Sequence, residues 1–379
     1  MLAAAPPPKR PISLEDLPVA VHGALPGGDF AALRQSLERQ TAERLREGER
    51  EHLIYYLLQS RRFTPLDRIE PAVSSQEFVE SGRIPEAARR RLEAFERAPA
   101  GTDPRLKYLR ALKADLETEY ARVMRSLYQK EFGGAAAGWY QQRGHSSDTQ
   151  VEAGYAVATA LGVIRALDPP ARLDHVLIVG PGVDFAPRTD FFEDLPPQSY
   201  QPFAVADALL SRRLASRSRL RIHAVDINER VVQFFDHRVR ELRMVSKPRD
   251  PGYTAWWEQL GRHIGPVSTS GESKRVAVRR EVAASVTAAK LNILTERYDP
   301  PPGYDLAVAT NVLLYFNRTE LLLALSNIAA MLRPGGYLVH NELRPEAEGF
   351  ARAVGLQPLQ ARSLRLGPEL LDGFVIHRK

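Results

Sequence analysis

Short continuous runs of apolar residues in the second half of the chain alternate with patterns in which apolar residues recur every three or four positions. A strand that is covered on both faces reads as a continuous apolar run, as in a parallel sheet. We predict strands at Val176–Val179, Leu220–Val225, within Val276–Leu294, at Asp305–Ala309 and at Tyr337–His340, and helices at Ala204–Leu214, Glu229–Arg243 and Pro345–Val354. This alternation indicates an α/β fold built on a doubly wound parallel sheet.

Two further strand patterns, Pro358–Leu366 and Gly373–Arg378, close the chain and are joined by a short turn. Strands with so short a connection pair in antiparallel fashion, which predicts an antiparallel edge at the C-terminal end of the sheet. Residues 244–275 are rich in Gly, Pro and Ser, and we expect an irregular segment there.

Helical patterns dominate the first part of the chain. Asp29 is a candidate N-cap, and apolar residues after it recur at spacings of three and four. Similar patterns cover Ile84–Arg97 and Asp103–Phe132, and a Pro-Pro break follows Asp168. We therefore expect a disordered Pro-rich lead over residues 1–12, a mostly helical region over residues 13–165 and the α/β domain over residues 166–379.

The composition is that of an ordinary globular protein, with 379 residues of which 44% are hydrophobic and 26% charged. No apolar run approaches the roughly 20 residues of a membrane-spanning helix. The absence of cysteine excludes disulfides, thiolate metal sites and a cysteine nucleophile. The net charge is +6, but no basic stripe is interleaved with aromatic residues, so nucleic-acid binding is not indicated.

The first residues, MLAAAPPPKRPIS, are compatible with two cellular locations of the protein. The apolar piece is too short for the core of a signal peptide, and the positive charges follow it rather than precede it. We therefore expect a flexible lead on a cytoplasmic protein. The alternative is the stub of an export signal that has been trimmed.

A glycine turn, Gly180-Pro181-Gly182, directly follows the first predicted strand of the sheet. Glycine at this point allows a tight turn and a close approach of the backbone to a ligand, which makes the three residues candidates for cofactor binding. The alternative is a plain turn at the exit of a strand.

Asp226, with Ile227 beside it, ends the next predicted strand. An acid there can accept hydrogen bonds from the ribose hydroxyls of a nucleotide, at roughly 20 residues beyond the glycines in a typical dinucleotide site. The spacing is longer here because Asp184–Gln201 forms a long polar, Pro-rich loop. The alternative role is a helix cap, which Asn228 can take instead.

Three further polar residues follow later strands. The amide of Asn292 offers both a donor and an acceptor to an adenine edge, although an ordinary turn asparagine is the alternative. Thr310 and Asn311 end the strand at Asp305–Ala309, and ligands of open α/β sheets bind outside the carboxyl ends of strands. A dehydrogenase is disfavoured, since its fingerprint requires a third glycine early in the first helix and none occurs there.

These motifs resemble those of class I S-adenosylmethionine (SAM)-dependent methyltransferases, and most of all the CheR-type protein-glutamate methyltransferases. Leu291-Asn292-Ile293-Leu294 is similar to their Leu-Asn-Leu-Leu, and Asn311–Phe316 to the end of their Arg-Asn-Val-Leu-Ile-Tyr-Phe. Pro334–Leu338 matches their Pro-Gly-Gly-Tyr-Leu, and His340-Asn341-Glu342 is similar to their His-Ser-Glu. The resemblance covers roughly residues 175–342 and implies a Rossmann-like methyltransferase sheet with SAM as its cofactor.

The resemblance also implies roles for particular residues. Asp226, Asn292, Ile293 and the residue at position 310 are expected to contact SAM. Two positions depart from the family: Thr310 replaces an arginine, and Gln201 aligns with an acid that binds SAM. The small N-terminal helical domain expected of a CheR protein is not recognisable.

The expected function is methyl transfer from SAM to an O or N nucleophile of an unidentified small molecule or protein side chain. Tyr315, which the resemblance places at the reacting centre, is expected to orient the acceptor or the methyl group, and His340 is a candidate base. Packing roles are the alternatives for both. Given the replacements at positions 201 and 310, a SAM-binding or scaffold protein without turnover is the alternative function.

Other residues have more open roles. Asp184, in the glycine loop, is a candidate for binding the amino group of SAM, with capping of the loop as its alternative. Tyr253, Trp256 and Trp257 either wall a substrate pocket or belong to the core. The helical region is expected to cover the cofactor cleft, to build the acceptor site or to serve as a protein-interaction module.

Overall fold

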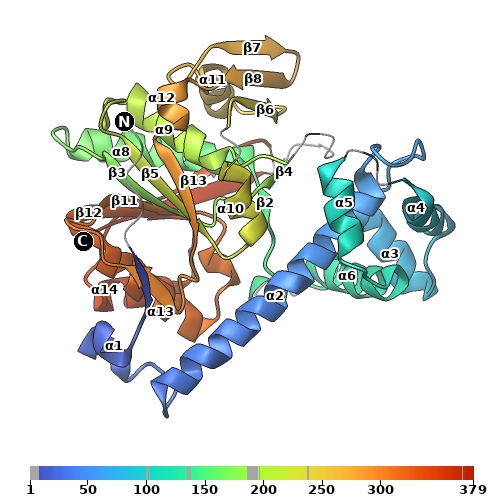
Figure 1. The fold of residues 1–379 in the computed structure, drawn as a ribbon, viewed down its shortest axis with the longest axis horizontal. Coiled ribbons are helices and arrows are strands. Elements are labelled where there is room, and N and C mark those ends of the chain that lie inside the picture. Colours follow the sequence, from blue (N-terminus) through green and yellow to red (C-terminus); the bar gives the residue numbers. More distant parts are fainter. Residues whose placement is uncertain are drawn as a thin grey trace. The chain divides into compact units, whose positions relative to one another are not determined.

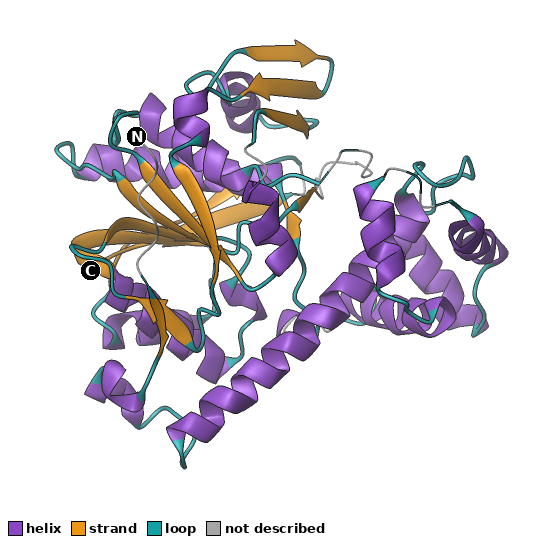
Figure 2. Ribbon diagram, viewed as in Figure 1, coloured by secondary structure: helices purple, strands orange, loops and turns teal. Residues whose placement is uncertain are grey.

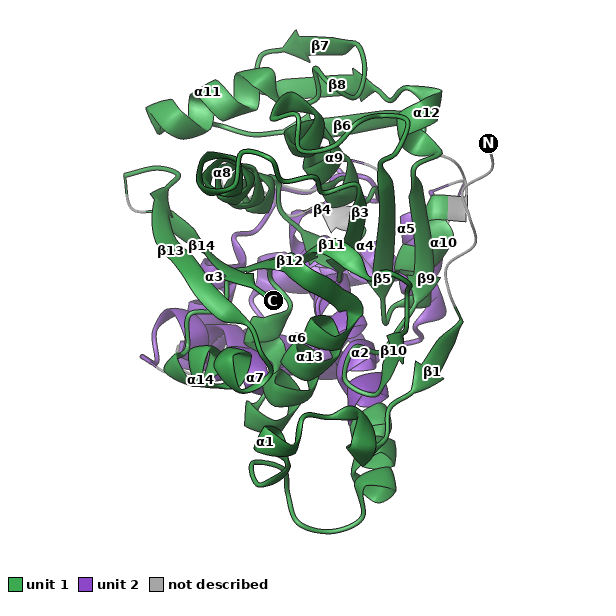
Figure 3. Cartoon of the chain, turned by 90° about the vertical axis from the view of Figure 1, so that its left-hand side faces the viewer, with its two compact units in different colours: residues 1–39, 148–191, 198–379 green, residues 40–147, 192–197 purple. Residues whose placement is uncertain are grey.

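The computed structural model describes residues 8–99, 101, 103–134, 138–185, 195, 197–236, 239–368 and 370–379. Its contacts form two compact units, which Figure 3 colours separately. The sheet unit contains the chain up to Arg39, Asp148–Phe191 and Gln198–Lys379, and the helical unit contains Gln40–Ser147 and Phe192–Pro197. These limits differ from the predicted boundaries after residues 12 and 165, because residues 8–39 and 148–165 pack with the sheet.

A seven-stranded sheet with the order β13-β14-β12-β11-β3-β5-β9 forms the centre of the sheet unit (Figures 1 and 2). Its strands are β3 (His175–Val179), β5 (Arg221–Asp226), β9 (Val286–Lys290), β11 (Tyr304–Ala309), β12 (Leu332–His340), β13 (Gln357–Arg365) and β14 (Leu371–Arg378). β14 runs antiparallel to both of its neighbours, and the other adjacent pairs are parallel. The predicted α/β class, with an antiparallel C-terminal edge and a preceding helical region, is confirmed.

Helices cover both faces of this sheet. α8 (Val151–Leu167) and α9 (Gln201–Ser211) lie on one face, and α13 (Arg318–Met331) and α14 (Pro345–Ala353) lie on the other, as Figures 1 and 3 show. The central strands are therefore buried on both sides, which explains why they read as continuous apolar runs.

The connection from β9 to β11 contains a short strand, β10 (Glu296–Tyr298), and no helix. β10 pairs antiparallel with β1 (Lys9–Pro11), and β1 is followed by η1 (Leu14–Asp16) and α1 (Val19–His22). The prediction of a disordered lead up to residue 12 is therefore wrong for β1. Residues 1–7 lie outside the described part of the chain. An N-terminal segment thus packs beside a loop encoded nearly three hundred residues later.

The segment between β5 and β9 also differs from its prediction. α10 spans Glu229–Asp236 and β6 begins at Glu241, so the prediction of one helix up to Arg243 is wrong. Residues 244–275 are not irregular, because α11 (Pro251–Gln259), β7 (Val267–Ser270) and β8 (Ser273–Ala277) form there. β6, β8 and β7 make a separate antiparallel sheet. The strands of this region form through pairing with one another, and the local sequence shows no helical or strand periodicity that would have predicted them.

The helical unit has a core of its own. It is built from most of α2 (Phe30–Gln59) together with α3 (Pro71–Ser81), α4 (Glu86–Arg97), α5 (Pro104–Ala111), α6 (Leu116–Glu131) and α7 (Trp139–Gln142). Arg91 is fully buried in this unit, and its guanidinium donates to the carbonyl oxygens of Leu57 (2.6 Å), Leu66 (2.6 Å) and Asp67 (2.9 Å). Burial lowers the pKa of Arg91 to about 10. The side chain therefore fixes the loop after α2 through backbone hydrogen bonds.

Within the described ranges, no helix is both long and apolar enough to cross a membrane. α2 has 30 residues, but charged side chains recur in it from Arg34 to Glu51. α13 is apolar but has only 14 residues, fewer than the roughly 20 that a bilayer requires.

Candidate functional site

A glycine turn follows β3 at the carboxyl edge of the sheet. Gly180 and Gly182 have φ values of 65° and 66°, which residues with a Cβ rarely adopt. A Cβ on Gly180 would lie 2.4 Å from Cγ2 of Val312, which follows β11. Pro181 and Gly182 are buried. Close approach of backbone and side chain thus requires glycine here, as in loops that cradle a cofactor.

The end of β5 lies next to this turn, because the Gly180 N–H donates to the carbonyl of Val225 over 2.8 Å. Asp226 and Ile227 are both half-buried. The Asn228 side chain accepts from the Arg230 N–H over 2.9 Å and so caps α10. Asp226 is therefore not needed as the helix cap, and its carboxylate bonds the N–H of Asn228 at the rim of the sheet.

The segment after β9 folds into a tight turn around Asn292. The side-chain oxygen of Asn292 accepts from the Leu294 N–H (3.1 Å), and its carbonyl accepts from the N–H groups of Thr295 (3.0 Å) and Glu296 (2.8 Å). The amide oxygen is thus engaged in its own turn, as in the alternative role considered for this residue. Pairing of this oxygen with adenine would require the turn to give up that bond.

Neighbouring elements hold this turn at the end of β5. The Leu291 N–H donates to the carbonyl of Asp226 over 3.0 Å. Ile293 is buried, and its carbonyl accepts from Nδ2 of the buried Asn327 on α13 over 2.7 Å. The predicted adenine contacts therefore lie beside the predicted ribose contact.

Gln201 and Thr310, the two positions that depart from the family pattern, contact each other. Nε2 of Gln201, the first residue of α9, donates to Oγ1 of Thr310 over 2.5 Å, and both side chains are at least 97% buried. Two of the candidate cofactor residues thus form a neutral hydrogen-bonded pair. It satisfies two polar groups without burying charge.

The residue after Thr310 has an unusual backbone. Asn311 has a φ of 58°, in the left-handed region that favours glycine and tolerates asparagine. Its N–H donates to Oδ1 of Asn341 over 2.8 Å, and Nδ2 of Asn341 donates back to Oδ1 of Asn311 over 2.8 Å. This reciprocal pair joins the carboxyl ends of β11 and β12 and holds the strained residue at the rim of the site.

Tyr315 lies on the short helix η2 (Leu313–Tyr315) that follows. Its side chain is half-buried and packs partly against the core. Arg344 holds this helix: its Nη2 donates to the carbonyl of Leu313 (3.0 Å) and to the buried carboxylate of Glu342 (2.9 Å). Tyr315 is thus carried by a supported turn at the carboxyl edge of the sheet, where the acceptor is expected.

His340 has a different environment from the one expected of a base. It is 1% exposed, and its ring stacks on that of His377 with centroids 5.1 Å apart. Nδ1 accepts from the Glu342 N–H over 3.1 Å, and Nε2 faces Nδ1 of His377 at 3.2 Å. Burial lowers the pKa of His340 to about 3 and that of His377 to about 4. Both ring nitrogens of His340 have partners inside the fold, which favours the structural alternative.

The remaining sequence candidates divide between the edge of the site and the core. Asp184 lies in β4 (Asp184–Phe185), whose backbone pairs with β2 (Asp148–Thr149), and its side chain is outside the described part of the chain. Tyr253 and Trp257 are buried, and Trp256 is half-buried against Tyr253 with centroids 5.5 Å apart. Tyr253 and Trp257 therefore form part of the core of the α11 region.

Sequence reasoning missed three residues that shape this edge. Val312 closes over Gly180, Asn341 pairs with Asn311, and Arg344 supports the helix that carries Tyr315. Asn341 lies within the His-Asn-Glu motif, which could have directed attention to it. The Asn311–Asn341 pair stabilises the positive φ of Asn311, and that backbone angle cannot be predicted from a single sequence.

Comparison with known proteins gives a family for part of this region. Residues 254–354 match the family model described as CheR methyltransferase, SAM binding domain. The chemotaxis protein methyltransferase of Salmonella typhimurium is 26% identical over 141 residues, which is 36% of this chain and 45% of that protein. The Escherichia coli protein of the same name is 27% identical over 141 residues and is covered to 46%. The match thus spans less than half the length of both relatives.

Two methyltransferases are among the solved structures that align with this chain at low scores. N-methyltransferase NodS from Bradyrhizobium japonicum aligns over 60% of this chain and 97% of its own, with 13% identity and a TM-score of 0.32. A Burkholderia thailandensis 1,6-didemethyltoxoflavin-N1-methyltransferase aligns over 69% and 89%, with 16% identity and a TM-score of 0.33. At these scores the similarity assigns no function.

The family match includes the strand β11, the Asn311–Asn341 pair and Tyr315, and it confirms the resemblance on which SAM is named as the cofactor. The strand order agrees with the expected methyltransferase sheet, in which an antiparallel strand, here β14, lies next to the edge strand. The chain therefore has a class I SAM-dependent methyltransferase fold, and its SAM-binding domain is related to that of the CheR methyltransferases.

Proposed function

We propose that the protein transfers the methyl group of SAM to an O or N nucleophile of a small molecule or protein side chain. The observation that carries this proposal is the CheR-type match at the carboxyl edge of β11 and β12, where open α/β sheets bind ligands. We assign the reaction to the cytoplasm, because SAM is a cytosolic metabolite.

Each part of the cofactor has a candidate partner at this edge. Asp226 and Ile227 would hold the ribose, and Asn292 and Ile293 would border the adenine. The glycine turn at residues 180–182 would approach the centre of the cofactor, with Asp184 nearby. Gln201, Thr310 and Asn311 would line the methionine part through neutral hydrogen-bonding groups, since no charged side chain occupies positions 201 and 310.

The transfer itself requires little from the protein beyond positioning. Bound SAM would supply a methyl group on its sulfur, and neutral S-adenosylhomocysteine would be the leaving group. Because the leaving group is neutral, alignment of the acceptor supplies much of the acceleration. We assign that alignment to Tyr315. A base is needed only if the acceptor must lose a proton. We do not assign that role to His340, because both of its ring nitrogens have partners inside the fold.

The direct test is calorimetric titration of SAM and S-adenosylhomocysteine into the full chain, with Asp226→Ala measured beside it. Binding to the wild type that is lost in the variant supports the cofactor site. A fold that binds neither ligand would overturn the proposal. Turnover is then measured by mass detection of S-adenosylhomocysteine, with cell extract as the source of acceptor.

A SAM-binding protein without turnover is the second candidate function. The observation that favours it is the Gln201–Thr310 pair, which replaces two charged residues of the family with a contact that the two side chains make to each other. Tight binding of S-adenosylhomocysteine with no release from SAM in any extract would select this candidate over methyl transfer.

A further inference from the structure

The connection between β9 and β11 has an unusual construction for a doubly wound sheet. Such crossovers usually carry a helix that covers the sheet, and residues 291–303 contain none. The N-terminal segment Lys9–Leu25, here called the strap, supplies apolar side chains in its place. Ile12, Leu17 and Val21 are buried in the same core cluster as Leu291, Ile293, Leu294 and Tyr298 of that connection.

Main-chain hydrogen bonds join the strap to the turn that carries the candidate adenine contacts. β1 pairs with β10, and the Ile12 N–H donates to the carbonyl of Thr295 over 3.0 Å. Thr295 is itself bonded to the carbonyl of Asn292. Two hydrogen bonds therefore connect the strap backbone to Asn292.

A shared carboxylate makes a second connection. Oε2 of Glu296 accepts from the Asn292 N–H over 3.1 Å and from Nζ of Lys9 over 3.0 Å. Glu296 is thus held between the strap and the turn, and separation of β1 from β10 would remove the Lys9 contact from the carboxylate that accepts from Asn292.

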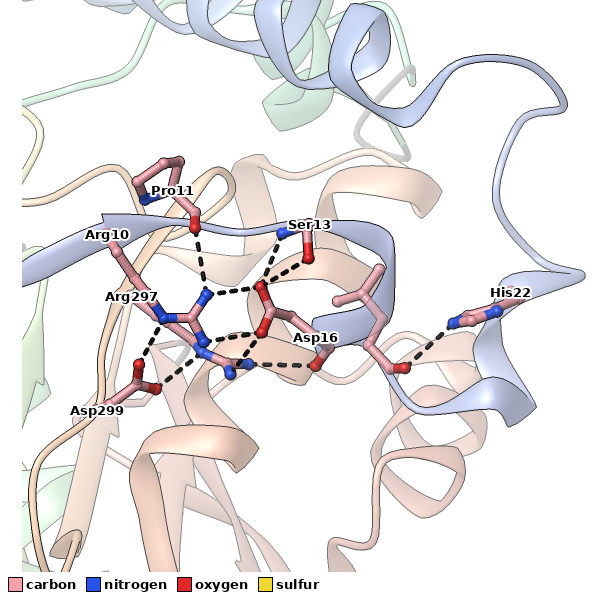
Figure 4. Close-up of polar contacts among 8 residues, drawn as sticks. Arg10, Pro11, Ser13, Asp16, His22, Arg297 and Asp299 are labelled. Atoms are coloured by element: carbon pink, nitrogen blue, oxygen red, sulfur yellow. Dashed lines mark hydrogen bonds and ion pairs between the residues drawn. The ribbon is translucent and has the colours of Figure 1, made fainter.

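Two arginines and two aspartates close the strap over this connection, as Figure 4 shows. Nη1 and Nη2 of Arg10 donate to Asp16 over 2.7 and 2.8 Å, and its Nε donates to Asp299 over 2.5 Å. Arg297 also bonds both acids, over 3.0 Å to Asp16 and 3.2 Å to Asp299. Asp16 and Arg297 are only 14% and 11% exposed. A network with one bidentate pair and partial burial is stronger than isolated surface ion pairs.

We infer that the strap positions the adenine-binding turn, with Asp16 and Glu296 as its positioning residues. The inference rests on the proposed SAM site and extends it to residues that do not touch the cofactor. A turn whose hydrogen bonds are already made pays less ordering entropy when the ligand binds. Release of the strap should therefore weaken cofactor binding in a protein that is still folded.

The chain offers a matched control for Asp16. Asp305, near the start of β11, is 16% exposed and pairs with Nε of Arg333 over 2.5 Å. It also accepts from the His175 N–H over 2.8 Å. Because it lies at the amino end of the parallel strands, it is remote from the carboxyl edge. Asp16→Asn and Asp305→Asn each remove a partly buried aspartate that pairs with arginine, two arginines in the case of Asp16 and one in the case of Asp305, and only Asp16 belongs to the strap.

The experiment is calorimetric titration of S-adenosylhomocysteine into the full-length wild type and both variants, with thermal unfolding measured in parallel. We expect Asp16→Asn to weaken binding about tenfold, equivalent to about 1.4 kcal/mol, and Asp305→Asn to leave affinity within about twofold. Hydrogen exchange of the amides at residues 292–296 should accelerate in the first variant alone. Equal affinities in the two variants, with equal exchange, would overturn the inference.

A second variant protects the test against a folding defect. Glu296→Gln keeps an acceptor for Asn292 but loses the charge that binds Lys9, and its site is partly exposed. We expect a weakening of about threefold, since one connection of the strap remains partly formed. Failure of the wild type to bind would instead refute the proposed cofactor site, so the two failures are distinct.

Discussion

Gln201 and Thr310 form a buried hydrogen bond at the point where α9 begins and β11 ends. Each side chain satisfies the other, and no charge is buried between them. The contact also connects the first helix after the glycine turn to the strand end that precedes Asn311. Two candidate cofactor residues that are 109 positions apart in the sequence thus lie in direct contact.

The first prediction concerns this pair. Thr310→Val keeps the shape of the side chain but leaves the Gln201 amide buried without its acceptor, which should lower the free energy of unfolding by about 1 to 3 kcal/mol. Thr310→Ser, which keeps the hydroxyl, is the control and should lose less. Urea unfolding measures both. A Val variant as stable as the Ser variant would show that the hydrogen bond contributes nothing.

The second prediction concerns the glycine turn. Gly180→Ala should destabilise the protein by about 1 to 3 kcal/mol, because the added Cβ meets Val312 and the backbone has a positive φ. It should also abolish S-adenosylhomocysteine binding in calorimetry. Adding Val312→Ala should recover part of the stability by removing the clash. Gly349→Ala, on α14 with nothing within 4 Å of the added Cβ, is the control that keeps binding intact.

The third prediction tests the alignment role of Tyr315. Once an acceptor is known, Tyr315→Phe should reduce kcat by about tenfold to a hundredfold through misplacement of the acceptor, while the Kd of S-adenosylhomocysteine stays unchanged. Tyr128→Phe changes a half-buried tyrosine of the helical unit and serves as the control. An unchanged kcat would assign Tyr315 to packing alone.

The fourth prediction concerns acid stability. Burial lowers the pKa values of His340 and His377 from 6.5 to about 3 and about 4, so the unfolded chain binds more protons than the folded one below pH 6.5. Stability should therefore fall as the pH drops from 6.5 towards 4, by about 1.4 kcal/mol per pH unit for each imidazole. Urea unfolding between pH 8 and 5 measures this slope.

Two variants distinguish the contribution of His340 and His377 to acid stability from that of other titrating groups. His377→Gln removes one titrating ring and should flatten the profile below pH 6.5. His175→Asn alters an exposed histidine at the start of β3 and should leave the profile as in the wild type. An identical slope in His377→Gln and the wild type would contradict the assignment.

Local sequence patterns were sufficient for the central sheet. β3, β5 and β11 were predicted to within about a residue or two, since strands covered on both faces must be apolar throughout. The glycine turn and Asp226 followed from the same reasoning, because the carboxyl ends of parallel strands share one edge. The strand ends that carry the candidate cofactor residues could therefore be located from the sequence, and the contacts of these residues with SAM stay predictions.

Contacts between distant segments were not accessible in this way. β1 consists of Lys-Arg-Pro and has no strand signature, and it forms because β10 and a set of acids are present elsewhere in the chain. β6 was read as the continuation of a helix for the same reason. The structural environment of His340 depends on His377, which an isolated motif does not contain.

The placement of the strap has a consequence for synthesis of the protein on the ribosome. Lys9 and Glu296 are 287 positions apart in the sequence. At a typical elongation rate, the strap emerges on the order of tens of seconds before its partner has been translated. The apolar residues Ile12, Leu17 and Val21 remain without their native neighbours for that interval. We therefore expect this chain to depend on chaperones during translation. The main segment of the helical unit is complete by Ser147, so this unit can fold before the partners of the strap have been translated.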